Sequence, residues 1–338
     1  MKNNILYNVL AAAVLLGLAS CEKVSPSGIL IGNTSVDDRA KMSYEYFANH
    51  KGEFAIADSE GEAYSFLVGS DSHLATDDGR LREMFQNSFD HKDLLCCHCG
   101  DIADTTPENY IRLEKLMDEY NAKCWKELYD YDAAHDIYYY KRDRPEQDKI
   151  PVHESVLQST RFPLFSCVGN HDITRNGWAL FSNIFHSSFF PLVVVVDENT
   201  VDIFAFLDSA AGTLGKYQVE KLDEVTANFE QWGIKIRNTF FFTHTNIFRP
   251  RLSEFSSTFP REETYYLLNK FSECQASLVF LGHVHKFDDR VYGGVRYITL
   301  DAMSERNSPN PGEYLERVHV AADGKVTCER VMMNYVAK

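Results

Sequence analysis

Residues 164–172 read LFSCVGNHD, a short apolar run followed by Gly169, Asn170, His171 and Asp172. Apolar runs of about four to eight residues are typical of strands that are buried on both faces of a sheet. Four other runs also end in side chains that can bind a metal ion. They are residues 64–70 before Asp71 and His73, 94–99 before Asp101 and Asp104, 240–243 before His244, and 278–281 before His283 and His285. Open α/β sheets bind ligands at the carboxyl ends of their strands, so we expect the five strand ends to converge.

The composition is that of a globular protein with an acidic surface. The 338 residues are 44% hydrophobic and carry a formal net charge of -15, so the chain can bury a sizeable core. A nucleic-acid surface, which needs clustered Lys and Arg, is not expected. An anionic substrate would need a local positive charge, and bound metal ions can supply one.

The first twenty residues predict a targeting signal rather than a part of the fold. Lys2 precedes the apolar residues 5–18, and residues 18–21 read LASC, a pattern found at secretory signals. The segment resembles a bacterial lipoprotein signal, which implies that Cys21 receives lipid and anchors the protein in the cell envelope, at the periplasm or outer membrane. An ordinary cleaved signal and a membrane helix are the alternatives, although the apolar run is shorter than the roughly 20 residues that span a bilayer.

The remaining chain is predicted to hold a tether and one domain. Residues 21–52 show no clear period and contain Ser, Pro and Gly, as linkers do, so the domain is expected over residues 53–338. Residues 118–160 are predicted to form an excursion that either helps to line the pocket or is a solvated helical hairpin. Together with residues 173–200, interpreted as a second loop, they would select the substrate.

Two smaller patterns complete the secondary-structure prediction. A helix from residue 108 is expected to bury one face that contains Ile111, Leu113, Leu116 and Met117. The cysteines at 96, 97, 99 and 167 lie inside expected central strands, where thiols act as small buried hydrophobes. A zinc site at residues 96–99 is disfavoured because alternate residues of a strand point to opposite faces.

The candidate ligands predict a centre with two metal ions. Asp71 and His73 are two residues apart, so both side chains can point the same way from an extended strand end, and His283 and His285 repeat this spacing. Seven candidates exceed the needs of one tetrahedral ion but suffice for two ions that share a carboxylate. Carboxylate, amide and imidazole together favour Mn, Fe, Zn, Co or Ni over Ca or Mg. The candidates are Asp71, His73, Asp101, Asn170, His244, His283 and His285.

In chain order, these residues resemble the five motif blocks of the calcineurin-like metallophosphoesterases. The matching blocks are Asp71-x-His73, Gly100-Asp101-x-x-Asp104, Gly169-Asn170-His171-Asp172, His244 and Gly282-His283-x-His285. The resemblance spans residues 71–285 and implies an α/β fold, a β-sandwich of two mixed sheets flanked by helices with a dinuclear metal site at the strand ends.

The same resemblance implies roles for individual residues. One metal ion would be bound by Asp71, His73, Asp101 and His285, and the other by Asp101, Asn170, His244 and His283. His171 would be a general acid that Asp104 orients. The implied reaction is hydrolysis of phosphate mono- or diesters by in-line attack of a hydroxide held between two divalent or trivalent metal ions. The Asp-x-His first block looks like the branch that contains phosphodiesterases and unlike purple acid phosphatases.

Substrate contacts and the class of the protein stay open at this level. Arg175, Asn176 and Arg249 follow the motifs and are candidates for binding a phosphate, although surface salt bridges are the usual role of exposed Arg. The expected partners are a small-molecule phosphate ester and, through Cys21, a membrane. A non-catalytic metal-containing binding lipoprotein with the same fold is the alternative function, and a metal-free structural domain is a third.

Overall fold

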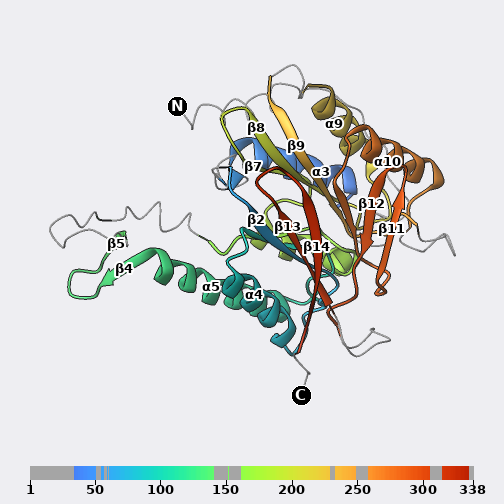
Figure 1. Ribbon diagram of the computed structural model, residues 1–338. Coiled ribbons are helices and arrows are strands. Elements are labelled where there is room, and N and C mark those ends of the chain that lie inside the picture. The colour runs from blue at the N-terminus through green and yellow to red at the C-terminus, as the bar shows by residue number, and fades with distance from the viewer. Residues whose placement is uncertain are drawn as a thin grey trace.

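The computed structural model describes residues 34–50, 55–56, 59, 61–140, 151, 161–228, 233–248, 258–304 and 314–334. In these residues a seven-stranded and a five-stranded sheet pack against each other (Figure 1). The strands of the first, in order across the sheet, are β1 (Ala55–Ile56), β7 (Phe190–Val195), β8 (Thr200–Leu207), β9 (Lys235–Thr243), β10 (Leu278–Leu281), β12 (Val295–Thr299) and β11 (Asp288–Tyr292). Those of the second are β14 (Val326–Met332), β13 (Tyr314–Val320), β2 (Tyr64–Gly69), β3 (Leu95–His98) and β6 (Leu164–Ser166).

Both sheets are mixed, as predicted. In the first sheet β8, β9, β10 and β12 are parallel, whereas β7 and β11 run antiparallel to their neighbours β8 and β12. In the second sheet β2, β3 and β6 are parallel, and β13 and β14 are antiparallel additions at one edge. The strands that end in candidate ligands therefore belong to the parallel part of each sheet, where carboxyl ends meet at one edge.

The packing of β2 explains why the predicted strands are apolar throughout. Phe66 and Val68 lie in the core between the two sheets, and the Phe66 ring centroid is 4.9 Å from that of Phe204 and 5.0 Å from that of Phe240. Leu67 points to the other face, where helices cover it. Successive side chains of a strand point to opposite faces, so a strand covered on both sides has no position for an exposed polar residue.

Helices cover the outer faces of both sheets. α3 (Val36–Asn49), α9 (Gly215–Asn228) and α10 (Arg261–Glu273) lie on the side of the seven-stranded sheet, and α4 (Gly79–His91), α5 (Pro107–Leu128) and α8 (Trp178–Phe185) lie on the opposite side (Figure 1). In the part of the chain that the structure describes, each helix is too short or too polar to cross a membrane.

α3 corrects the predicted start of the domain. Ser35 caps this helix by accepting a hydrogen bond from the Asp38 N–H, and Phe47 is fully buried in the central core. Arg39 is also buried, and its guanidinium donates to both carboxylate oxygens of Asp208 at 2.8 and 2.9 Å. The prediction of a tether over residues 21–52 is therefore wrong for residues 36–49, because this segment packs on the sheet. The predicted signal at residues 1–20 and Cys21 lie outside the described residues.

The region around α5 differs from the prediction in two respects. The described part of the excursion at 118–160 consists of the end of α5 and a ribbon of β4 (Tyr129–Asp132) and β5 (Ile137–Tyr140), which α5 carries away from the two sheets (Figure 1). Ile111 is 49% exposed, whereas the preceding residue, Tyr110, is 3% exposed, so the buried face of α5 includes Tyr110 in place of Ile111.

The second predicted loop is also largely regular structure. Residues 173–200, interpreted as a loop, contain α8 and β7.

β3 is the most enclosed strand that leads to the candidate ligands. Its cysteines at 96 and 97, and those at 99 and 167, are fully buried free thiols, which confirms the interpretation of these residues as small hydrophobes. His98 is also fully buried, and among the described residues neither of its ring nitrogens has a hydrogen-bond partner. Burial lowers the pKa of His98 to about 3, so the ring is neutral inside the folded protein.

Replacing His98 with leucine is expected to stabilise the metal-free protein, and to do so more at acidic pH. A buried polar group without a partner costs about 1–3 kcal/mol, and leucine removes it at similar volume. The ordinary pKa of His is about 6.5, so between pH 6.5 and 3 the unfolded chain binds one proton more than the native chain at this position. Stability therefore falls with decreasing pH in the wild type, by about 1.4 kcal/mol per pH unit from this group.

Urea unfolding in EDTA at pH 7.5 and pH 5 measures this effect. The expected result is a larger midpoint for His98→Leu at both pH values, with a wider difference at pH 5. His319→Leu, at a more exposed position on β13, is the control and should not widen the difference. An unchanged or lower midpoint for His98→Leu at pH 5 would contradict the account of β3.

Candidate metal centre

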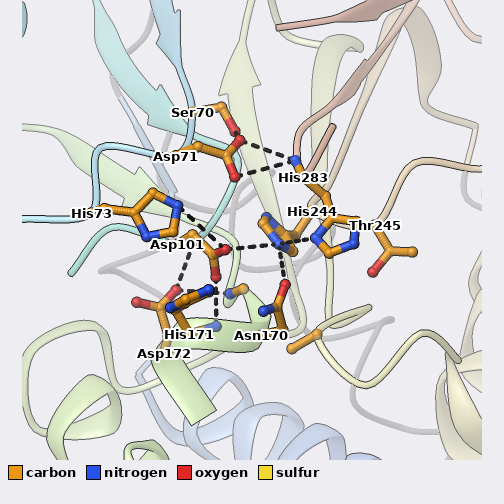
Figure 2. Close-up of polar contacts among 12 residues, drawn as sticks. Ser70, Asp71, His73, Asp101, Asn170, His171, Asp172, His244, Thr245 and His283 are labelled. Carbon is orange, nitrogen blue, oxygen red and sulfur yellow. Dashed lines mark hydrogen bonds and ion pairs between the residues drawn. The ribbon is translucent and has the colours of Figure 1, made fainter. Parts of the chain in front are cut away.

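The loops after β2, β3, β6, β9 and β10 bring the candidate ligands together at one edge of the sandwich (Figure 2). Backbone hydrogen bonds tie these loops to one another: the Asp71 N–H donates to the Gly100 carbonyl, and the Gly282 N–H donates to the His244 carbonyl, both at 3.0 Å. Residues more than 200 positions apart in sequence thus share one site. The expected convergence of the five strand ends is present in the fold.

Asp71, His73 and His285 form a first group, whose ligand atoms lie within 4.8 Å of one another. His285 Nε2 is 3.1 Å from Asp71 Oδ1 and 3.4 Å from His73 Nε2. Burial alone would raise the pKa of Asp71, but the hydrogen bond from His285 and the charge of His244 hold it well below its usual range. The Ser70 hydroxyl also donates to Asp71. Asp71 is therefore a carboxylate anion that faces two imidazole rings.

Asp101, His244 and His283 form a second group with the same spacing limit of 4.8 Å. Asp101 Oδ2 is 3.3 Å from His244 Nε2 and 3.8 Å from His73 Nε2, so this carboxylate lies between the two groups. Asn170 contributes its Oδ1, 3.0 Å from His244 Nε2. All seven predicted ligands are thus near one another, and Figure 2 shows Asp101 between His73 and His244.

The donors in this cluster fit a pair of transition-metal ions. His244 Nδ1 lies 2.9 Å from the Cys99 carbonyl oxygen. A carbonyl oxygen can only accept a hydrogen bond, so Nδ1 carries a proton. In the neutral ring the lone pair is then on Nε2, which faces the cluster. Such outer contacts commonly orient metal-binding histidines. Burial opposes a proton on His244 Nε2, but the charge of Asp101 raises the pKa of His244 to about 9. A cation bound at this atom would therefore replace a proton.

Backbone strain is concentrated in the same residues. Non-glycine residues seldom adopt positive φ, which costs on the order of 1–3 kcal/mol where a strained conformation is held. Five of the seven candidate ligands adopt it, with φ of 53° at Asp71, 43° at His73, 54° at Asp101, 70° at His283 and 57° at His285. Such strained residues cluster at functional sites. Here they include both members of the pairs Asp71 and His73, and His283 and His285.

Asp172 supports the loops that carry Asp101 and Asn170. The sequence analysis predicted no role for it. Its Oδ2 accepts hydrogen bonds from the Gly169 and Asp101 N–H groups, both at 2.8 Å, and its Oδ1 accepts one from the Tyr110 hydroxyl at 3.0 Å. Burial and the charge of Asp101 raise the pKa of Asp172 to about 6. A Cβ at Gly169 would lie 2.2 Å from the Asp101 nitrogen, so glycine is required where the two loops meet.

His171 has a side chain that is 49% exposed, and one of its ring nitrogens lies within 4.8 Å of ligand atoms of His73 and Asp101. Its Nδ1 is 3.6 Å from Asp104 Oδ1, and its backbone N–H donates to Asp101 Oδ1 at 2.7 Å. The contact with the Asp104 carboxylate raises the pKa of His171. The neighbourhood of Asp104 thus favours a protonated imidazole at the open side of the site, which is the property of a general acid.

The predicted substrate contacts are less well defined. Arg175 and Asn176 lie in the short 3-10 helix η3 (Thr174–Asn176), exposed and with φ of 50° and 64°, while Arg249 lies outside the described residues. A separate cavity of about 660 Å³ lies under α3, α9 and α10, lined by residues such as Phe47, Ile203 and Lys221. None of its lining residues belongs to the Asp and His cluster.

Fold and site together define a class: α/β sandwiches whose strand ends carry a cluster of Asp and His side chains able to bind metal ions. The family model of the calcineurin-like phosphoesterases matches residues 64–287. This range covers both groups of candidate ligands and His171, and the chain belongs to that family.

Solved structures with a similar fold include phosphatases and a phosphodiesterase. A dimetal phosphatase from Danio rerio is 11% identical with a TM-score of 0.43, over 79% of this chain and 95% of that chain. The purple acid phosphatase PPD1 of yellow lupin is 11% identical with a TM-score of 0.48, over 82% and 52%. An archaeal phosphodiesterase is 9% identical with a TM-score of 0.37, over 79% and 99%. Comparison with curated proteins gave no match.

Proposed function

We propose that this protein is an exported, lipid-anchored phosphoesterase that hydrolyses phosphate mono- or diesters with two transition-metal ions. The observation that carries the proposal is the position of Asp101 Oδ2 between His244 of one ligand group and His73 of the other, beside an exposed His171. One ion would be bound by Asp71, His73, Asp101 and His285, and the other by Asp101, Asn170, His244 and His283. A metal-free structural domain would not need these buried charges, which are costly unless they are compensated.

The chain's own residues supply the remaining chemistry. Two bound cations would neutralise the charge of a phosphate ester and lower the pKa of a water between them. His171 Nδ1 faces Asp104 Oδ1 at 3.6 Å, so Nε2 is the atom to which we assign donation of a proton to the oxygen leaving phosphorus. Asp104 holds the ring in this orientation, and Asp172 fixes the backbone of both loops that carry Asp101 and Asn170. Arg175 and Asn176 are candidates for binding a phosphate oxygen, as is Arg249.

Metal reconstitution tests the reaction. Protein stripped with a chelator should bind close to two ions per chain from Mn, Fe, Zn, Co or Ni, and should then hydrolyse bis(p-nitrophenyl) phosphate or p-nitrophenyl phosphate. Comparison of the two substrates decides between diester and monoester preference. Two bound ions without turnover on either ester would favour the binding lipoprotein, and fewer than one ion per chain would favour a structural domain.

The proposal of export and lipid anchoring rests on residues 1–21, which resemble a lipoprotein signal. Mass spectrometry of the mature protein from bacterial membranes tests it, because a lipid-modified Cys21 should be the first residue. An N-terminus at any other residue would contradict the anchor without affecting the proposed reaction.

A further inference from the structure

One oxygen of Asp104 faces two histidines that have different roles. Asp104 Oδ1 is 3.2 Å from His73 Nδ1 and 3.6 Å from His171 Nδ1. The two rings are nearly perpendicular, at 89°, with centroids 4.6 Å apart. Thus the carboxylate that was expected to orient the acid His171 is closer to the candidate metal ligand His73.

The position of Asp104 is fixed independently of both histidines. Its backbone N–H donates to the Leu74 carbonyl at 3.1 Å, and its own carbonyl accepts the Thr106 N–H at 2.8 Å and the Asn109 Nδ2 at 2.9 Å. These bonds join the loop after β3 to the loop after β2 and to the first turn of α5. Asp104 is therefore held by the scaffold and can impose an orientation on side chains that contact it.

The contact with His73 determines which of its nitrogens is free to bind a cation. A carboxylate accepts hydrogen bonds and cannot donate them, so His73 Nδ1, which is within hydrogen-bond distance of Asp104 Oδ1, must carry a proton. In the neutral His73 ring the lone pair is then on Nε2. This atom faces the cluster, 3.4 Å from His285 Nε2 and 3.8 Å from Asp101 Oδ2.

We propose that Asp104 is a positioning residue for two groups at once: it fixes the acid His171 and it holds His73 in the tautomer and orientation that bind metal. The inference rests on the proposed function and deepens it, because loss of one carboxylate would then disturb metal binding and proton donation together. If Asp104 acted through His171 alone, its loss would leave metal affinity unchanged.

Calorimetric titration of Mn²⁺ into the stripped full-length protein separates the two roles. Asp104→Ala should lower Mn²⁺ affinity by about 10–100-fold, the range typical for loss of a carboxylate behind a metal-binding histidine. His171→Ala is the matched variant and should stay within about twofold of the wild type. Asp104→Asn should recover part of the affinity, since its amide oxygen can still accept the His73 N–H.

Nitrogen chemical shifts of ¹⁵N-histidine-labelled, metal-free protein give a second measurement on the same variants. His73 should be an Nδ1–H tautomer in the wild type and in Asp104→Asn, and a mixture in Asp104→Ala. Wild-type affinity and an unchanged His73 tautomer in Asp104→Ala would overturn the proposal. Failure of the proposed function has a different signature, namely wild-type protein that binds Mn²⁺ but hydrolyses no ester, and the affinity and tautomer comparisons would still decide the role of Asp104.

Discussion

Asp101→Ala is expected to lower metal binding from two ions to one or fewer per chain and to lower kcat/KM by more than about 10³-fold. Asp101 Oδ2 lies between His244 and His73, at 3.3 and 3.8 Å, so its loss removes the link between the two groups. Loss of a residue that only supports a ligand typically costs about 10–100-fold, and loss of a shared ligand must cost more. Its Oδ1 also accepts the His171 N–H, so the acid loses a support.

Metal analysis of the dialysed protein measures the number of bound ions. Esterase assays with Mn²⁺ or Zn²⁺ measure the change in kcat/KM. Asp93→Ala serves as the control, because Asp93 is a buried carboxylate that pairs with Arg317 at 3.2 Å, away from the metal centre. The control is expected to lose stability but to keep two ions per chain. If Asp101→Ala also retained two ions and most of its turnover, Asp101 would not be the shared ligand.

The positions of the ligands could be predicted because they depend on a simple property of sheets. Runs such as residues 278–281 are apolar on both faces, and the carboxyl ends of parallel strands meet at one edge. Knowing the strands therefore suffices to bring Asp71 and Asp101 together, because they follow adjacent strands of one sheet, whereas His283 follows β10 of the other sheet and reaches them only through the packing of the two sheets.

α3 was missed although its pattern is present in the sequence. Val36, Ala40, Tyr44 and Phe47 recur at three or four residues and are buried, and Ser35 followed by acidic residues is an N-terminal signal for a helix. The preceding Ser, Pro and Gly residues favoured a linker. The buried guanidinium of Arg39 donates two hydrogen bonds to Asp208 and one to the Thr34 carbonyl. The pairing with Asp208 joins residues far apart in the sequence, so it has no local sequence signature.

The role of Asp172 could not be predicted for a different reason. Asp172 accepts hydrogen bonds from the backbone N–H groups of Gly169 and Asp101. Nearly every residue has such an N–H group, so the sequence does not indicate which ones Asp172 will bind. Tyr110 was overlooked because the predicted face of its helix was displaced by one residue, toward Ile111. Its hydroxyl is satisfied by Asp172 inside the core, so a polar group that appears suited to solvent is buried.

His171→Ala is expected to leave metal content unchanged and to lower turnover by about 10²–10⁴-fold on alkyl phosphate esters, the usual contribution of a general acid. Its Nδ1 faces Asp104 and its ring is half exposed at the edge of the cluster, so its loss removes a proton donor without removing a ligand. Esters of p-nitrophenol should lose much less, because their leaving oxygen is stable without a proton. Steady-state assays on paired alkyl and nitrophenyl esters measure the difference.

The pH dependence of the same variant tests whether the effect is proton transfer. The contact with the Asp104 carboxylate raises the pKa of His171 above the ordinary value of about 6.5. A general acid works in its protonated form, so wild-type activity on alkyl esters should fall as pH rises through that higher pKa. His171→Ala should lack this fall, while His135→Ala, on the exposed turn after β4, should keep it. Equal losses on both kinds of ester, with an unchanged pH profile, would show that His171 positions the substrate rather than donating a proton.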